Sequence, residues 1–178
     1  MTTASKVTMI RIALIPFFMA AALLDFPHAN IIALALFILA SVTDWIDGYI
    51  ARKYEQITDF GKFIDPLADK LLVTSAMLIF VQWGTMPAWA LMVVLTREFA
   101  VSGLRMVAAS KGSVIAAAGS GKIKTVVTIL GITIMLVTAN LAYAPGVEIG
   151  NQVVIALILI ATVYSGLEYF AKNMNVLK

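Results

Sequence analysis

The sequence has no cysteine and a single histidine, His28. Without cysteine there is no disulfide framework, no thiol nucleophile and no zinc site built on cysteine. One histidine likewise excludes a mechanism that needs two histidines in one chain. Charge is also scarce, because 13% of the residues are Asp, Glu, Lys or Arg, against about 25% in an ordinary soluble domain. The formal net charge of +3 is too small to indicate binding to nucleic acid.

Hydrophobic residues are abundant and make up 61% of the 178 residues. A core of this length could not bury so much apolar surface, so lipid must be the solvent for much of the chain. We therefore expect an all-α integral membrane protein with six transmembrane helices, forming one domain over residues 1–178. The expected spans are residues 12–24 with an extension back to 8, 31–50, 66–83, 88–109, 125–140 and 152–170.

Lys and Arg residues gather on one side of this predicted arrangement. The exception among the 13 basic residues is Arg97, which lies inside the fourth span. The three loops expected on the opposite side contain neither Lys nor Arg. Because basic loops favour the cytoplasmic side of a membrane, we expect both termini to be cytoplasmic.

Four aspartates lie where the second span ends and the third begins. Asp44 and Asp47 are three residues apart, so both carboxylates share one face of a helix. Asp65 and Asp69 are four residues apart and again share a face. Pro66 suits a first helical turn, so we expect the third helix to begin there with Asp65 near its cap. An antiparallel pairing of the two helices would bring the four carboxylates together at the cytoplasmic membrane boundary.

Such a group of carboxylates suits a metal site. Four neighbouring carboxylates cannot all stay ionised without cations, and hard oxygen ligands favour Mg²⁺ or Mn²⁺. Two ions about 4 Å apart could share carboxylates and clamp a diphosphate. Gly48 and Ala51 share the face of the first pair and leave room for a bulky ligand. The alternative from another class is a divalent-cation transporter that uses the four aspartates as its site.

The order and spacing of these residues match a known signature, Asp-x2-Asp-Gly-x2-Ala-Arg-x8-Gly-x3-Asp-x3-Asp. Every fixed position is met, by Asp44, Asp47, Gly48, Ala51, Arg52, Gly61, Asp65 and Asp69. By this signature the sequence resembles the CDP-alcohol phosphatidyltransferases, and the resemblance extends over nearly the whole chain. It implies the CDP-alcohol phosphotransferase membrane fold, a homodimer, and a multi-pass position in the plasma membrane of a bacterium with a cytoplasmic active site.

The resemblance also implies roles for single residues. It assigns two divalent ions, Mg²⁺ or Mn²⁺, to the four aspartates, and it makes Asp69 the general base. Thr8 and Arg11 fit a Thr-x2-Arg element near the family's N-terminus, although the usual Asn-Pro before that element is replaced here by residues 4–6 (Ala-Ser-Lys). The residues that would contact CDP-diacylglycerol are Thr8, Arg11, Asp44, Asp47, Gly48, Ala51, Arg52 and Gly61.

Two further segments bear on the acceptor alcohol. Residues 96–99 (Thr-Arg-Glu-Phe), followed by Arg105, and residues 121–125 (Gly-Lys-Ile-Lys-Thr) resemble the branch of this family whose acceptor is sn-glycerol 3-phosphate. Arg105, Lys122 and Lys124 fall at cytoplasmic helix ends, where a dianionic acceptor needs cations. We therefore expect transfer of the phosphatidyl group of CDP-diacylglycerol to glycerol 3-phosphate, with release of CMP.

Alternatives to this acceptor site remain open. Within the same family, the acceptor could be inositol phosphate or serine. The basic residues could instead be anchors that touch the headgroups of membrane lipids. For Lys122 and Lys124, only one need point inward. Arg97 and Glu98 are adjacent charges in mid-helix that could simply neutralise each other.

Overall fold

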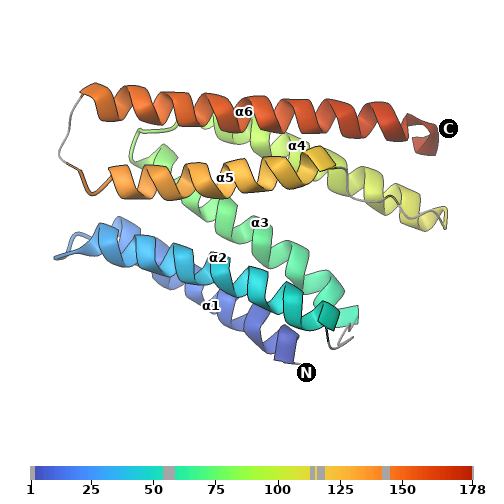
Figure 1. Cartoon of the computed structure of the whole chain (residues 1–178), viewed down its shortest axis with the longest axis horizontal. Coiled ribbons are helices and arrows are strands. Elements are labelled where there is room, and N and C mark those ends of the chain that lie inside the picture. Colours follow the sequence, from blue (N-terminus) through green and yellow to red (C-terminus); the bar gives the residue numbers. More distant parts are fainter. Residues whose placement is uncertain (1–2, 54–58, 113–114, 116–118, 142–144, 178) are drawn as a thin grey trace. The chain divides into compact units, whose positions relative to one another are not determined.

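The computed structural model describes residues 3–53, 59–112, 115, 119–141 and 145–177. Within its helices, the side chains of residues 3–6, 44–53, 59–63, 65–66, 145 and 176–177 lie outside this description. The described chain is helical, without any strand (Figure 1). Its helices are α1 (Thr3–Leu23), α2 (Ala29–Lys53), α3 (Asp59–Gln82), α4 (Ala88–Ser110), α5 (Gly119–Thr138), α6 (Pro145–Asn173) and a short 3-10 helix, η1 (Met174–Leu177).

Each predicted span corresponds to one of the six α-helices, but several helices begin earlier than predicted. α3 begins at Asp59, so the prediction that Pro66 lies in its first turn with Asp65 near the cap is wrong. Residues 59–64 carry apolar side chains at three- to four-residue spacing, which extends the helical pattern in front of the proline. α6 begins at Pro145 rather than at the predicted start of the sixth span, residue 152, since proline is favoured in the first helical turn.

The helices fall into two compact units. The first unit comprises Met1–Gln82 and Ile132–Tyr143, and the second comprises Trp83–Gly131 and Ala144–Lys178. α5 contributes to both units, because the division falls within it. These units are defined by packing alone, so a single domain over residues 1–178 stays a prediction.

In the first unit, α1 packs against both α2 and α3. The buried face of α1 carries Ile15 and Phe18, and Phe18 meets Phe37 of α2 with 5.8 Å between the ring centroids. Ala33 and Ala40 are fully buried on the same face of α2 as Phe37, and such small residues let neighbouring helices approach closely. This packing brings the beginning of α1 beside the end of α2 and the beginning of α3 (Figure 1).

In the second unit, α4 packs against α6, and the first part of α5 also contacts α6. The contact with α5 is close at Gly131, where an added Cβ would lie 2.8 Å from Cδ1 of Ile158. A larger residue at position 131 would therefore force the side chain of Ile158 to shift. The close contact of α5 with α6 fixes which face of α5 is buried in this unit, and Lys124 lies on that face.

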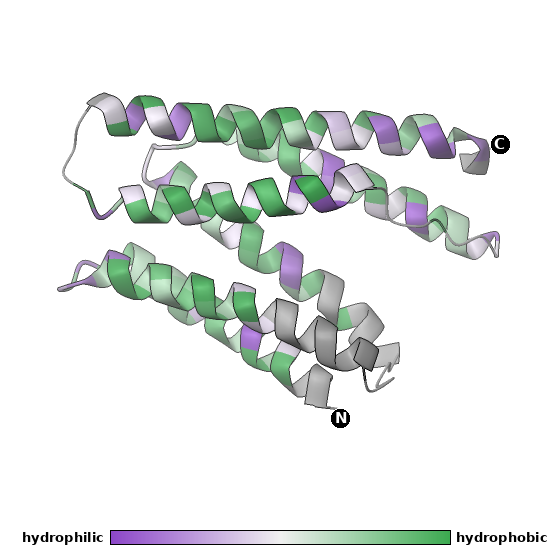
Figure 2. Cartoon of the chain, in the orientation of Figure 1, coloured by the Kyte–Doolittle hydropathy of each residue, from purple (hydrophilic) through white to green (hydrophobic). Residues whose placement is uncertain are grey.

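The described helices are strongly apolar (Figure 2). Two stretches, Gly119–Thr138 and Gly146–Asn173, are long and apolar enough to cross a membrane, and Val7–Leu23 and Ala29–Thr43 are shorter apolar stretches. Large hydrophobic side chains also face outward; Leu167, for example, is 68% exposed. Exposed apolar surface of this extent is typical of contact with lipid or with other proteins, and together with the apolar helices it points to a membrane protein.

Candidate active site

The aspartate motif occupies the end of α2 and the first half of α3. The backbone is helical at Asp44 and Asp47 and again at Asp65 and Asp69, so each pair lies on a single helix as predicted. Asp69 is half-buried and has an interaction partner. The side chains of the other motif residues lie outside the described part of the chain; they are Asp44, Asp47, Gly48, Ala51, Arg52, Gly61 and Asp65.

The carboxylate oxygens of this motif are chemically suited to bind a divalent ion. The four aspartates, two on α2 and two on α3, supply the oxygen ligands that Mg²⁺ and Mn²⁺ prefer. Among the side chains that the structure describes, which include only Asp69 of the four, no group of three or more His, Cys, Asp or Glu residues could hold a metal. The predicted metal ligands therefore stay a prediction.

Thr8 and Arg11 lie on the face of α1 that packs against α2 and α3. Both side chains are fully buried, at 0% exposure, and both have interaction partners. A buried guanidinium is costly unless anions or hydrogen-bond acceptors surround it, which is not the setting of a residue that merely anchors a helix at the membrane surface. Both residues lie in the first half of α1, the helix that packs against α2 and α3, which carry the aspartate motif.

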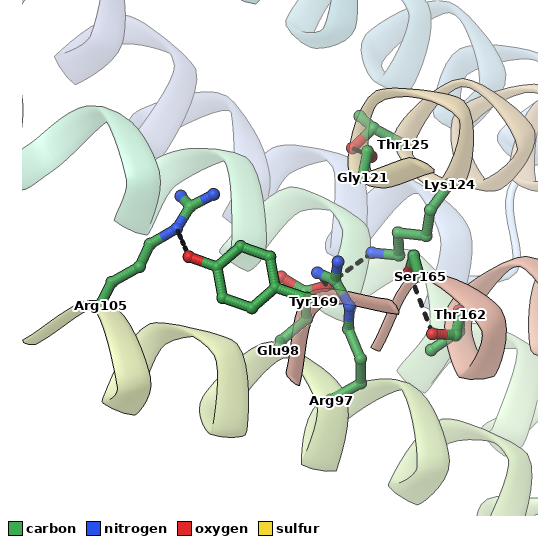
Figure 3. Close-up of polar contacts among 9 residues, drawn as sticks. All are labelled: Arg97, Glu98, Arg105, Gly121, Lys124, Thr125, Thr162, Ser165 and Tyr169. Atoms are coloured by element: carbon green, nitrogen blue, oxygen red, sulfur yellow. Dashed lines mark hydrogen bonds and ion pairs between the residues drawn. The ribbon is translucent and has the colours of Figure 1, made fainter. Parts of the chain in front are cut away.

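The two lysines of α5 have different surroundings. Lys122 is exposed, whereas Lys124 is only 6% exposed. The Nζ atom of Lys124 donates a hydrogen bond to Oε1 of Glu98 on α4, with 2.8 Å between the two atoms (Figure 3). Only Lys124 therefore points into the second unit, which resolves the alternative that the sequence left open.

Glu98 also pairs with its neighbour Arg97. The Nη1 atom of Arg97 lies 2.9 Å from the same carboxylate oxygen that Lys124 contacts. Arg97 and Glu98 form an ion pair, as one of the open alternatives allowed, but with Lys124 the group holds two positive charges and one negative charge and is not simply neutral. Glycine makes room for Arg97, because a Cβ at Gly166 would lie 3.1 Å from its Cγ atom. This group, the Arg97–Glu98–Lys124 cluster, thus has a net positive charge.

Arg105 lies about two helical turns further along α4. Its side chain is exposed, and its Nε atom donates a hydrogen bond of 3.0 Å to the hydroxyl of Tyr169 on α6. The central carbon of the guanidinium is 5.4 Å from the centroid of the Tyr169 ring. Sequence reasoning missed Tyr169; the available signal was its hydroxyl, since a tyrosine hydroxyl usually finds a hydrogen-bond partner when it is buried.

The predicted residues are divided between the two units. The aspartate motif, Thr8 and Arg11 belong to the first unit, and the three predicted acceptor cations belong to the second. Within the second unit, Arg105 and Lys124 approach different partners, Tyr169 and Glu98.

The sequence has also been compared with protein families. The family model described as CDP-alcohol phosphatidyltransferase matches residues 1–165, which include the whole aspartate motif. The chain is a CDP-alcohol phosphatidyltransferase family member. This confirms the resemblance seen in the motif and favours a transferase over a cation transporter. CDP-alcohol phosphatidyltransferases generally use divalent metal ions.

Two similar proteins within the family carry the same name. The chain is 45% identical to the CDP-diacylglycerol–glycerol-3-phosphate 3-phosphatidyltransferase of Bacillus subtilis (strain 168), over 98% of this chain and 96% of that protein. It is 37% identical to the protein of the same name from Haemophilus influenzae (strain ATCC 51907 / DSM 11121 / KW20 / Rd), over 91% of this chain and 88% of the relative. Both similarities span almost the full length of each protein.

Proposed function

We propose that this protein transfers the phosphatidyl group of CDP-diacylglycerol to sn-glycerol 3-phosphate, forming phosphatidylglycerophosphate and CMP. The observation that carries the proposal is the 45% identity, over 98% of the chain, with a relative named for this reaction. The intact aspartate motif on helical backbone supports it, because transfer of a phosphatidyl group from a diphosphate needs a site that neutralises phosphate charge.

Asp44, Asp47, Asp65 and Asp69 hold two divalent ions, Mg²⁺ or Mn²⁺, in this proposal. The helix register supports this assignment. On α2, positions 44, 47 and 51 continue the three- to four-residue spacing of the buried residues Ala33, Phe37 and Ala40. On α3, position 65 stands one turn before the buried Ala68. Both pairs are thereby expected on the faces that meet α1.

The diphosphate of CDP-diacylglycerol binds beside these aspartates, against the part of α2 that carries Gly48, Ala51 and Arg52 and against Gly61 of α3. Arg11 supports this placement because it is a fully buried cation on the helix that packs against both, and charged hydrogen bonds from Arg suit phosphate oxygens. Thr8, buried one turn before Arg11, adds a hydroxyl at the same end of the unit.

The reaction is a single displacement. Bound divalent ions supply the positive charge that offsets the diphosphate. Asp69 accepts the proton of the 1-hydroxyl of glycerol 3-phosphate while that oxygen forms a bond to the β-phosphorus of CDP-diacylglycerol. The bond from this phosphorus to the bridging oxygen breaks, and CMP leaves with the electron pair. Positioning of the two substrates and electrostatic stabilisation supply most of the catalysis.

The phosphate of glycerol 3-phosphate binds to Arg105 and Lys124, with Lys122 at the edge of the site. The burial of Lys124 and the net positive charge of the Arg97–Glu98–Lys124 cluster support this assignment. Lys122 lies outside this cluster and is exposed, unlike Lys124 on the same helix, which favours a weaker role for Lys122. Arg105 has the planar fork that can hold a phosphate through two hydrogen bonds.

We further infer the arrangement of the protein in its membrane. The six α-helices cross the plasma membrane of a bacterium six times, with both termini and the active site on the cytoplasmic side, where the basic loops gather. The acyl chains of CDP-diacylglycerol stay among the membrane lipids while its headgroup enters the site. The chain acts as one domain over residues 1–178 and forms a homodimer, as the family resemblance implies.

An acceptor panel tests the proposed function. Purified protein receives CDP-diacylglycerol and Mg²⁺ together with glycerol 3-phosphate, inositol phosphate or serine, and mass spectrometry identifies the phospholipid formed. We expect phosphatidylglycerophosphate to form only with glycerol 3-phosphate. A preference for inositol phosphate or serine would overturn the acceptor while keeping the family, and a failure to form any phospholipid would overturn the proposal itself.

A further inference from the structure

Tyr169 contacts Arg105 in a way that leaves part of the guanidinium available. Its hydroxyl accepts a hydrogen bond from Nε, the nitrogen within the side chain of Arg105, at 3.0 Å. Among the residues drawn in Figure 3, the hydrogen bond of Arg105 comes from Nε and not from its two terminal nitrogens. Because the five donors of a guanidinium lie in one plane, a partner at Nε sets the direction of the outer fork without occupying it.

The ring of Tyr169 is itself held in place. Tyr169 is 2% exposed and belongs to a buried cluster with Val101 and Leu104 of α4. Phe170 packs against the same cluster, and Nδ2 of Asn173 donates a hydrogen bond of 2.7 Å to the backbone carbonyl of Tyr169. An exposed arginine normally samples many rotamers, and fixing them costs free energy when a ligand binds. A hydrogen bond to a hydroxyl on a rigid ring restricts the rotamers of Arg105 before the ligand binds, so less conformational entropy is lost on binding.

We propose that Tyr169 is a positioning residue that orients Arg105 to receive the phosphate of the acceptor. This inference rests on the proposed function, in which Arg105 binds the phosphate of glycerol 3-phosphate. It adds α6 to the acceptor site and assigns a role to a residue that carries no charge. Tyr169 touches neither substrate; it acts through the hydrogen bond to Nε.

The test is a Tyr169→Phe variant, which removes the hydroxyl and keeps the buried ring. We expect KM for glycerol 3-phosphate to rise roughly three- to tenfold, the range expected when a hydrogen bond is lost, while kcat and KM for CDP-diacylglycerol change less than about twofold. The matched control is Tyr164→Phe on the same helix, where the side chain is 63% exposed and no change is expected. A thermal melt of each variant reports on folding.

An Arg105→Lys background isolates the hydrogen bond, because lysine has no counterpart of Nε. In that background, adding Tyr169→Phe should change KM for glycerol 3-phosphate by less than about twofold, since coupled residues are not additive. A further full rise in the double variant, or an equal change of KM for both substrates, would show a merely structural role and overturn the proposal.

An Arg105→Ala variant distinguishes a failure of the proposed acceptor site from a failure of the positioning role of Tyr169. If it leaves KM for glycerol 3-phosphate unchanged, the proposed acceptor site is wrong and the role of Tyr169 falls with it. If Arg105→Ala raises that KM while Tyr169→Phe does not, the acceptor site stands and the positioning role alone is overturned.

Discussion

The two units of the molecule differ in how their charged side chains are balanced. The motif of the first unit is a set of four aspartates on the end of α2 and the first half of α3, and Arg11 is buried on the face of α1 that packs against these helices. The second unit holds basic side chains, and there Glu98 supplies a counter-charge to both Arg97 and Lys124. A concentration of like charges needs ions from outside, whereas a cluster with its own counterion does not. The first unit should therefore depend on divalent cations and the second should not.

The largest expected effect follows from removing carboxylates of the first unit. Asp69→Asn should lower the rate of phosphatidyl transfer by at least about 100-fold, because it removes the general base, and Asp44→Asn, Asp47→Asn and Asp65→Asn should each remove most activity. Activity should also vanish with chelator and return with Mg²⁺ or Mn²⁺. Asp25→Asn is the matched control, since Asp25 is exposed in the turn between α1 and α2. Full turnover in chelator would contradict the metal site.

Alanine variants of the cations in the second unit come next. Arg105→Ala and Lys124→Ala should each raise KM for glycerol 3-phosphate by about 10- to 100-fold, as expected for a hydrogen bond to a charged group, with a smaller change in KM for CDP-diacylglycerol. Lys122→Ala is the comparison on α5, and its effect should be smaller because Lys122 lies at the edge of the proposed site, whereas Lys124 is buried within the second unit. Wild-type KM values for glycerol 3-phosphate in all three variants would disprove the acceptor site.

Glu98→Gln tests the internal counter-charge of the second unit, because it leaves Arg97 and Lys124 without a negative partner. We expect a loss of roughly 3 kcal/mol in the free energy of unfolding, the cost of removing one partner from a buried ion pair. Replacing Lys124 as well, in Glu98→Gln/Lys124→Met, should recover part of that loss but not the binding of glycerol 3-phosphate. Unfolding curves in detergent measure both variants.

A matched surface pair provides the control for that measurement. Glu168 pairs with Lys172 one turn away on α6; the glutamate side chain is 23% exposed, but the lysine side chain is 64% exposed, against 8% for Lys124. Glu168→Gln should leave the melting temperature nearly unchanged, since an ion pair with a solvent-exposed partner contributes little. If Glu98→Gln is as harmless as Glu168→Gln, the Arg97–Glu98–Lys124 cluster does not stabilise the second unit.

The smallest effect is expected from single cysteines that report topology. The chain has no cysteine, and both His28 and Lys111 are exposed, so His28→Cys and Lys111→Cys should be active and readily labelled. In intact cells an impermeant thiol reagent should label position 28 and not position 111. Labelling at 111 alone would reverse the orientation and place the acidic motif away from cytoplasmic substrates.

Much of this organisation could be predicted from the sequence. The apolar runs located all six α-helices, and the spacing of Asp44, Asp47, Asp65 and Asp69 identified the family. The ends of the helices were predicted less well. An apolar run marks only the part of a helix that lipid covers, and polar residues can continue the helix beyond that part. The early start of α3 at Asp59 is an example.

Contacts between distant residues could not be predicted in this way. Nothing in the local pattern of α5 says that Lys124 rather than Lys122 points inward; that depends on the close contact of α5 with α6 at Gly131. The hydrogen bond from Arg105 to Tyr169 joins residues 64 positions apart, and no spacing rule connects them. Sequence spacing identifies residues on one helix face, while packing decides which partners they meet.

The most direct test of the central claim is the dependence of CMP release on acceptor and metal. Purified protein in vesicles that contain CDP-diacylglycerol should release CMP only when both Mg²⁺ and glycerol 3-phosphate are present, in equal amount to the phosphatidylglycerophosphate formed. This stoichiometry follows from a single displacement in which Asp69 takes the proton of the acceptor. CMP release at the same rate without glycerol 3-phosphate, or Mg²⁺ flux into the vesicles without any CMP, would contradict the account.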